Sequence, residues 1–546
     1  MGKQYTKEEL QKLDKSALIN LFITTQESMQ AQLDQLNQNM ERLIEQIAIA
    51  NNQRYGRKSE KLDVVDGQLD LSSMFFNEAE ALTATSWIPE PPIDDVVKPS
   101  KPRKKKGKRE EDLKDLPVEI IEHTIPEEKL QETFGKSWKE LPVETYKRVK
   151  YVPASCTVEE HRVHLYAGKD QEGNDTIIRA DRPVDLLRNS IATPSLVSGI
   201  MNAKYTNALP LYRIEQEFER NDININRQVM ANWMILCAER YLSVIYDKLH
   251  KELLELGIIQ SDETPVTVTK DGRPTGSKSY MWVHRSGKSY KNKIILYDFQ
   301  KTRGSKHAKA FLSGFKGICV SDAHSAYKKL DRENVDINLA GCWSHARRRF
   351  VDALKALKDK STATGTIAHE ALRQIAAIYK LNNELEDKPP DEKLKMRQLI
   401  VKPLVEAFFV WAKEQQSSLL PKGKTAEGIE YCINQEKCLK TFLEHPDVPM
   451  DNNAAEAALR GFVIGRNNWK MIDTIDGAKA SATIYSIVET AKANHLNPYQ
   501  YLNHLLTVIP RHMDDKNLDF LEDLLPWSEN LPKECHNLKA KQQAAE

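Results

Sequence analysis

The sequence contains no Cys-x-x-Cys pair, although it holds seven cysteines in 546 residues. Their odd number and wide dispersion argue against a disulfide framework, and the spacing typical of a structural zinc site is missing. We therefore interpret them as buried free thiols of a protein in a reducing compartment, and we expect no zinc. The cysteines are Cys156, Cys237, Cys319, Cys342, Cys432, Cys438 and Cys535.

Long apolar runs are also missing from the sequence. No stretch is long and apolar enough to span a membrane, and the N-terminal MGKQYTKEEL is charged and lacks the apolar core of a secretion signal. With 40% hydrophobic and 29% charged residues, the composition is that of a globular protein in water. We expect a cytoplasmic protein without membrane contact, and the length favours roughly three or four domains.

The sequence has almost no net charge, because 79 basic residues are balanced by 78 acidic ones to give +1. The total charge neither indicates nor excludes a nucleic acid partner, since local patches bind a phosphate backbone. One patch is the run at residues 101–109, in which seven of nine residues are basic, including Lys104, Lys105 and Lys106. We predict an arm that binds DNA, with a solubilising tail as the alternative. A second basic segment, at 54–61, offers Arg57 and Lys58 for phosphate contacts, although a solvated surface would have the same composition.

Apolar residues recur in alternating steps of three and four between residues 18 and 50. They form one stripe on a helix, which is the pattern of a coiled coil, and we predict a homodimer or a higher homo-oligomer. A helix packed on its own domain is the alternative. One row of the stripe is Phe22, Met29, Leu36 and Leu43, and the other is Gln26, Leu33, Met40 and Ile47.

Two further patterns follow a segment rich in proline and basic residues. Residues 117–190 alternate in a strand-like manner, for example at 161–166, which predicts a small β-rich module. Residues 225–233 then resemble the second helix of a helix-turn-helix, in which Arg227 and Gln228 lie on the polar face. Contact of that face with DNA and plain helical packing both remain open.

Three carboxylates stand out by their position. Asp262 and Asp322 each follow a serine at the end of a short apolar run, and they are 60 residues apart. Strand ends are where α/β folds present reactive side chains. Glu456 follows the cap-forming segment Asp-Asn-Asn at 451–453 and begins a strongly helical stretch.

These three acids suit phosphodiester chemistry. That chemistry uses two divalent ions about 4 Å apart, held by carboxylate oxygens, and we expect two Mg²⁺ ions with Mn²⁺ as a substitute. Each acid by itself would be read as a cap or turn residue. Only the ordered set, two strand ends and one helix, indicates a ribonuclease-H-like catalytic core with Asp262, Asp322 and Glu456 as its catalytic metal ligands.

Basic residues surround the predicted acids in the sequence and suit a polyanionic substrate, although a solvated basic face is the alternative. The spacing of 134 residues between the second and third acids exceeds that of a minimal fold, so we predict a helical insertion that covers a DNA end. The candidate DNA contacts in this part are His345, Arg347, Arg348, Arg349, Arg460, Arg466 and Lys470.

We thus predict a multidomain α+β protein, in which a ribonuclease-H-like α/β core with a large helical insertion follows a coiled coil, a basic linker, a small β-rich module and a helical DNA-binding domain. The predicted segments are the coiled-coil segment 1–62, the proline-rich and basic linker 63–116, the β-rich module 117–190, the helix-turn-helix-like domain 191–256, the first part of the core 257–350, the helical insertion 351–445, the second part of the core 446–485 and a C-terminal module 486–546.

An ordered series of motifs resembles the IS66-family insertion-sequence transposases over about residues 20–530. The Asp-Glu-Thr-Pro and Asp-Asn-Asn-Ala-Ala-Glu strings are specific when they occur in this order. The series comprises RYGRKSEK at 54–61, the lysine-rich run at 101–109, YVPA at 151–154, LPLYR at 209–213, SDETPV at 261–266, DAHSAY at 322–327, GCWSHARR at 341–348, DNNAAE at 451–456, IGRNNW at 464–469 and LLPW at 524–527.

The resemblance implies a DDE transposase that cuts the inverted-repeat ends of a mobile element and joins the freed 3′-hydroxyls to target DNA. It implies Mg²⁺ on Asp262, Asp322 and Glu456, and small accessory proteins of the same element as partners. One departure is that such proteins typically carry a cysteine-rich zinc module before the YVPA string, whereas residues 117–150 contain no cysteine. We infer that this module has lost its metal or is held together by packing.

Two other functions fit some of these features. A catalytically inactive protein that binds element ends as a dimer would explain the coiled coil and the basic runs, but a decayed copy is expected to lose one of the acids, and all three are present. A plain metal-dependent nuclease would explain the acids and leave the coiled coil and the basic arm without a purpose.

Overall fold

The computed structural model describes residues 156–169, 175–181, 183–274, 276–333, 335–356, 365–419 and 423–537. The predicted coiled coil, the basic segments with Arg57, Lys58 and Lys104 to Lys106, and the linker lie outside these residues. The chain divides into two compact units. The described residues up to Pro183 belong to the first unit, and those from Val184 onward belong to the second.

The described part of the first unit contains one hairpin, formed by the antiparallel strands β1 (Leu165–Lys169) and β2 (Asp175–Arg179). The strand predicted at 161–166 was placed too early, because pairing begins only where Leu165 lies opposite Arg179. Alternation of side chains marks a segment that is able to form a strand, whereas the partner strand decides where the ladder starts.

A five-stranded mixed sheet lies at the centre of the second unit, in the order β6-β5-β3-β7-β8. Strand β3 is central: it pairs antiparallel with β5 and parallel with β7, and β6 and β8 form the edges. The two strands predicted to lead to Asp262 and Asp322 are confirmed as β3 and β7, and β3 continues past Asp262. The strands are β3 (Ile258–Val266), β5 (Ser279–Ser286), β6 (Ile295–Gln300), β7 (Gly317–Val320) and β8 (Ile337–Ala340).

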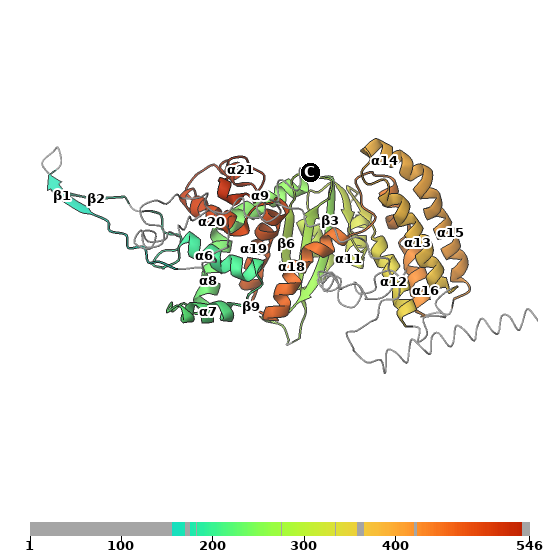
Figure 1. The fold of residues 1–546 in the computed structure, drawn as a ribbon, viewed down its shortest axis with the longest axis horizontal. Helices are drawn as coiled ribbons and strands as arrows, with labels where there is room; N and C mark the ends of the chain where they lie inside the picture. The colour runs from blue at the N-terminus through green and yellow to red at the C-terminus, as the bar shows by residue number, and fades with distance from the viewer. Residues whose placement is uncertain are drawn as a thin grey trace, which may run out of the picture. The chain divides into compact units, whose positions relative to one another are not determined.

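Some helices precede the sheet in the sequence and others follow its first strand (Figure 1). Both groups share one hydrophobic core with the sheet. The helix predicted at 225–233 is confirmed as α8, and the side chain of Asn226 caps it by accepting from the Val229 N–H at 2.9 Å. These helices are α6 (Pro194–Met201), α7 (Leu211–Arg220), α8 (Arg227–Cys237), α9 (Ser243–Leu254), α10 (Ser305–Phe311), α11 (Ser325–Glu333), α18 (Asn453–Trp469), α19 (Ile475–Ala493), α20 (Pro498–Val508) and α21 (Leu521–Leu524).

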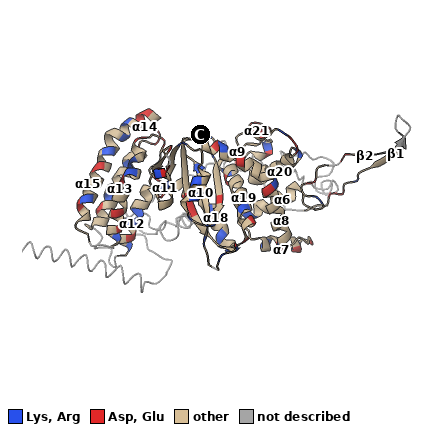
Figure 2. Ribbon diagram, turned by 180° about the vertical axis from the view of Figure 1, so that it is seen from behind, with Lys and Arg blue, Asp and Glu red and all other residues tan. Residues whose placement is uncertain are grey.

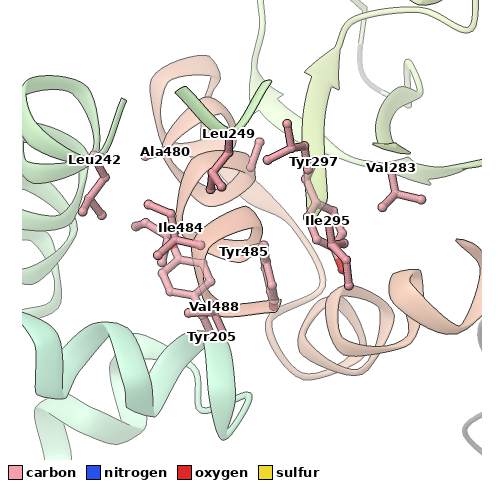
Figure 3. Close-up of a cluster of buried hydrophobic side chains, with 14 of the residues drawn as sticks. Tyr205, Leu242, Leu249, Val283, Ile295, Tyr297, Ala480, Ile484, Tyr485 and Val488 are labelled. Carbon is pink, nitrogen blue, oxygen red and sulfur yellow. The ribbon is translucent and has the colours of Figure 1, made fainter. Parts of the chain in front are cut away.

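Helix α19 packs along the edge strand β6 and covers it. Figure 3 shows Ile484 and Tyr485 of α19 in one buried cluster with Leu249 of α9 and Tyr297 of β6. The Ser486 hydroxyl of α19 also accepts a hydrogen bond from the Tyr297 N–H at 2.7 Å. An edge strand carries unpaired backbone groups, so this helix both buries β6 and satisfies its backbone.

A block of helices between α11 and α18 forms a second core. It packs against Ile258, Ile318, Val320 and Ala340 of the sheet, so the predicted insertion is one layer of the fold. The block is helical as predicted. Its helices are α12 (Trp343–Lys355), α13 (Ile367–Asn383), α14 (Pro390–Met396), α15 (Lys402–Gln416), α16 (Lys424–Asn434) and α17 (Glu436–Lys440).

The helical block enters and leaves the core at neighbouring points. The Gly341 N–H donates to the Cys438 carbonyl at 2.9 Å, and the Trp343 N–H donates to the Met450 carbonyl at 3.0 Å. Inside the block, the buried Arg397 donates to the carbonyl of Val448. The two ends of the block are therefore joined by backbone hydrogen bonds next to the sheet.

Smaller elements complete the second unit. Strands β4 (Val268–Lys270) and β9 (Ile472–Thr474) form a two-stranded parallel sheet that the sequence did not predict. Basic and acidic residues alternate along α15, and α13 also carries both signs of charge (Figure 2). Among the helices of the described residues, none combines the length and apolar character that a membrane crossing requires.

Candidate active site

The pairing of β3 with β7 brings the first two predicted acids together. Ile258 lies opposite Ile318 and Gln260 opposite Val320, so the register between the strands is the same 60 residues that separate Asp262 from Asp322. In a parallel pair, residues in register point to the same side of the sheet. The spacing in the sequence thus brings the middle of β3, where Asp262 lies, close to the loop after β7, where Asp322 lies.

Asp262 lies in the middle of β3 and is 8% exposed. One carboxylate oxygen accepts the N–H of Glu263 at 2.8 Å. Burial raises the pKa of Asp262 well above its ordinary value, and the nearby charges of Glu263, Glu456 and Asp322 raise the pKa further. A buried carboxyl among other carboxylates strongly favours its neutral form unless a cation joins them.

Asp322 follows β7 in a tight loop. Its Oδ1 accepts the N–H of His324 at 2.8 Å, and the next residue, Ala323, adopts a left-handed φ of 56°. The loop is held from the helical block, because the Tyr431 hydroxyl donates to the Asp322 carbonyl at 3.1 Å and the Gln435 side chain donates to the Ala323 carbonyl at 3.3 Å. These bonds keep a strained, non-glycine turn in place.

Glu456 comes from the first turn of α18, as the sequence predicted. The helix begins at Asn453 with Asn452 as N-cap, and the buried Asn452 amide donates to the Ser261 carbonyl at 2.8 Å. Arg285 of β5 also donates to the Ala454 carbonyl at 2.9 Å. The start of α18 is thereby attached directly to β3 beside Asp262.

The carboxylate of Glu456 is 2% exposed and lies between two basic side chains of α12. His345 Nδ1 is 3.8 Å from Oε1, and Arg348 Nη2 is 3.7 Å from Oε2. Burial raises the pKa of Glu456, although the charges of His345 and Arg348 oppose that shift. Its Oε1 is buried and has no hydrogen-bond partner, which leaves a strong acceptor available to a ligand.

Glu263 belongs to an ion network that extends to Asp322. Because β3 continues to Val266, Glu263 points to the opposite face from Asp262, as expected. There it accepts from Arg303 Nε and from the Tyr327 hydroxyl, the latter at 3.1 Å. Arg303 also reaches Asp322, with Nη2 3.5 Å from Oδ2. No sequence pattern pointed to Arg303, which links two acids only through the fold.

The predicted basic residues of α12 lie around the site to different degrees. Arg348 and His345 contact Glu456, whereas Arg347 is half-buried nearby. Arg349 is exposed and its guanidinium lies over the Tyr431 ring, 4.3 Å from the centroid. One face of α12 therefore points towards Glu456, and another face contacts α16 of the same helical block.

The remaining predicted DNA contacts lie on α18 and α8. Arg460 is half-buried, and Lys470 is exposed at the end of α18. Arg466 donates to Thr264 Oγ1 at 2.9 Å and to the Pro265 carbonyl, so it fixes the end of β3. Arg227 and Gln228 are exposed on the first turn of α8.

The donor atoms fit hard divalent cations. Asp262, Asp322 and Glu456 contribute carboxylate oxygens, the ligands that Mg²⁺ and Mn²⁺ prefer. Bringing them together in a buried place costs free energy that a cation would offset, as the raised pKa values of Asp262 and Glu456 indicate. Glu456 also belongs to a second group among the described residues: ligand atoms of Cys342, His345 and Glu456 lie within 4.8 Å of one another.

Three family models match parts of this chain. The sequence model described as "Transposase IS66 family" matches residues 189–480, which include all three acids. The "IS66 C-terminal element" matches residues 486–527, and "Transposase C of IS166 homeodomain" matches residues 42–121.

Two relatives come from Sinorhizobium fredii (strain NBRC 101917 / NGR234). The uncharacterized protein y4qI is 28% identical over 422 residues, which cover 75% of this chain and 76% of the relative. The uncharacterized protein y4jD is 26% identical over 393 residues, which cover 70% and 75%. Since the family's own model spans more than half of the sequence and contains the strands and the helix that carry the acids, the chain belongs to the IS66 family of transposases.

Proposed function

We propose that this protein is a DDE-type transposase that cuts the ends of a mobile element and joins the 3′-hydroxyls to target DNA. The observation that carries the proposal is the convergence of Asp262, Asp322 and Glu456 from two neighbouring strands and one helix. Membership of a transposase family supplies the substrate class.

The topology supports a ribonuclease-H-like core. Three antiparallel strands, β6, β5 and β3, continue into two parallel strands, β7 and β8. The first acid lies on the central strand, the second at the end of its parallel neighbour, and the third on a helix attached to the central strand. The sequence predicted two strands and one helix for these acids, although it placed Asp262 at a strand end and not within the strand.

Asp262, Asp322 and Glu456 would hold two Mg²⁺ ions, with Mn²⁺ as a substitute. Two such ions supply an activated oxygen nucleophile and a Lewis acid for phosphodiester exchange. The protein's own part is positional: Asn452 aligns the start of α18 with β3, and Tyr431 holds the loop of Asp322. The burial of the acids keeps water from competing for their oxygens.

DNA binding is proposed for the basic residues that the structure leaves on the surface. Lys470 on α18, and Arg227 and Gln228 on α8, are exposed. Arg348 and His345 adjoin Glu456 and would lie next to a scissile phosphate, with Arg347 and Arg460 half-buried on the same two helices. Arg349 and Arg466 have structural partners and are weaker candidates.

The N-terminal basic residues Arg57, Lys58 and Lys104 to Lys106 are proposed as further phosphate contacts. A homodimer or a higher homo-oligomer would pair two element ends, and accessory proteins of the same element are proposed partners. These proposals rest on the sequence patterns alone.

The test is a cleavage and joining assay on DNA carrying the element's own ends, with Mg²⁺ or with EDTA. Wild type is expected to give 3′-end cleavage and joined products only with Mg²⁺. Asp262→Asn, Asp322→Asn and Glu456→Gln should each abolish both products while end binding remains. Asp298→Asn serves as the matched control, since Asp298 is a half-buried acid of β6 in the same sheet.

Three outcomes would redirect the proposal. Cleavage by Glu456→Gln at the wild-type rate would remove that residue from the chemistry. Binding of ends by folded wild type with neither product would favour an inactive DNA-binding protein. Cleavage without joined products would favour a plain nuclease.

A further inference from the structure

Cys342, His345 and Glu456 form a compact cluster beside the three acids. Cys342 immediately precedes α12, and His345 lies three residues later in its first turn. Glu456 reaches them from α18, and one ligand atom of each residue lies within 4.8 Å of the others. The proposed catalytic metal site uses only Glu456, His345 is a proposed DNA contact, and Cys342 has no role in that proposal.

We propose that these three side chains bind Zn²⁺, and that occupancy of this site withdraws Glu456 from catalysis. A thiolate, an imidazole and a carboxylate are the ligand types that zinc takes in proteins. Thiolate sulfur selects zinc over Mg²⁺, which prefers oxygen ligands alone. The cluster therefore differs in metal preference from the all-oxygen set of Asp262, Asp322 and Glu456.

The charge of the cluster suits a buried dication. A Cys342 thiolate and a Glu456 carboxylate together neutralise one Zn²⁺, and a neutral His345 adds a ligand without adding charge. Cys342 is fully buried, and Glu456 is 2% exposed. Glu456 Oε1, the oxygen nearer to His345, is buried without a hydrogen-bond partner, so an acceptor that needs a partner points into the cluster.

The surroundings hold the sulfur in place. The Asn452 N–H donates to Cys342 Sγ at 3.2 Å, as N–H groups do to metal-bound thiolates. The Trp343 N–H donates to the Met450 carbonyl at 3.0 Å, which fixes the start of α12 against the segment leading to α18. The ligands are thus presented by two helix starts that are hydrogen-bonded to each other's approach segments.

This site has no signature that a spacing search detects. Two of its ligands form a Cys-x-x-His pair, and the third lies more than a hundred residues further along the chain. The expectation of no zinc rested on the missing Cys-x-x-Cys pair, a criterion that this cluster does not need. The inhibitory half of the proposal rests on the proposed function, because it requires Glu456 to serve the Mg²⁺ site.

Binding is tested separately from activity, with Co²⁺ as a spectroscopic substitute for Zn²⁺. The full chain carrying Cys156→Ser is used, because Cys156 is the exposed cysteine and could bind metal by itself. Addition of Co²⁺ should produce sulfur-to-cobalt charge-transfer absorption, and Zn²⁺ should abolish it by displacement. Cys342→Ser should remove this absorption, and His345→Gln should weaken Zn²⁺ binding by at least about 10-fold.

The matched control is Cys432→Ser, which alters another fully buried cysteine within the helical block and should leave the absorption unchanged. Thermal unfolding confirms that each variant is folded, and His345→Gln provides the decision if Cys342→Ser does not fold. Absence of the absorption in folded protein, or its persistence in Cys342→Ser, would overturn the site.

The regulatory half is tested by adding Zn²⁺ to Mg²⁺-dependent cleavage. Each variant is compared with its own rate without Zn²⁺. Low Zn²⁺ should inhibit the wild type, and His345→Gln should need at least about 10-fold more Zn²⁺ for the same fractional inhibition. Equal inhibition of both would overturn the withdrawal of Glu456. A protein that binds Co²⁺ through Cys342 but never cleaves DNA would instead refute the proposed function and leave the metal site standing.

Discussion

The Tyr431 hydroxyl lies 3.1 Å from the backbone carbonyl oxygen of Asp322 and donates a hydrogen bond to it. Tyr431 belongs to α16 in the helical block, whereas Asp322 ends a strand of the sheet. Gln435 adds a second bond from the same part of the block to the Ala323 carbonyl. The block therefore positions one of the three acids.

Replacing Tyr431 with phenylalanine removes only that hydroxyl. We expect Tyr431→Phe to lower cleavage at limiting Mg²⁺ by roughly fivefold, which corresponds to about 1 kcal/mol for one hydrogen bond. Saturating Mg²⁺ should restore much of the rate, because the ion itself orders the loop. Mg²⁺ titrations of the cleavage rate measure this, with the α20 variant Tyr499→Phe as the control. An unchanged Mg²⁺ requirement would separate the block from the site.

Arg303 pairs with the buried Glu263 and also reaches Asp322. Arg303→Leu leaves the Glu263 carboxylate without its cation, and we expect a loss of about 1–3 kcal/mol in the free energy of unfolding. The double variant Glu263→Gln/Arg303→Leu should recover part of this loss, since the stranded charge is gone. Chemical denaturation of both single variants and the double variant gives the coupling energy. Additive effects would show that the pair does not interact.

The metal-free protein should become more stable when Asp262 is neutralised. Burial raises the pKa of Asp262 above its unfolded value of about 3.9. Between these two values the folded state holds a proton that the unfolded state has released, so stability falls as pH rises from about 4. Asp262→Asn removes this loss. In EDTA near neutral pH its melting temperature should exceed that of wild type, and a lower value would contradict the assignment.

His284 should have the opposite effect from Asp262 on the pH dependence of stability, because it lowers the free energy of unfolding as pH falls. Burial lowers its pKa to about 3, with the Nδ1 atom hydrogen-bonded to Ser261 at 2.8 Å and the ring stacked on Phe311. Its unfolded pKa is about 6.5, so the unfolded state takes up a proton that the folded state refuses. The stabilising effect of the neutral ring is present above pH 6.5 and is lost as pH falls towards 3.

His284→Asn should therefore flatten the dependence of stability on pH in that window. The slope attributable to one such histidine is at most about 1.4 kcal/mol per pH unit. Denaturation midpoints at several values between pH 4 and 7 measure it. A slope identical to that of wild type would mean that the imidazole titrates in the folded state.

The sequence predicted the strands and the helix that carry the three acids, because each of these elements has a local pattern. Asp262 and Asp322 follow apolar runs that form β3 and β7, and Glu456 follows a cap segment that starts α18. Their common spacing of 60 residues also proved to be the register of the two strands. Strand and helix patterns in this part were confirmed for the same reason, since alternation and helical periodicity are local properties.

Contacts between segments that are distant in the sequence could not be predicted, because no local sequence pattern marks them. Arg303 joins Glu263 and Asp322 only because α10 begins beside the sheet, and Cys342 meets Glu456 only because two helix starts converge. The helical block is a further example. Its helices were predicted from the sequence, whereas the packing of its apolar side chains on Ile258 and Ile318 of the sheet was not.

The way the helical block is joined to the core has a mechanical consequence. Its two ends meet at the Trp343–Met450 hydrogen bond, just before the helix of Glu456, and its α16 helix holds the loop of Asp322. The block is thus joined to the core at the elements that carry Asp322 and Glu456. A force on its outer helices would therefore reach the elements of all three acids, because the start of α18 is also hydrogen-bonded to Ser261 beside Asp262.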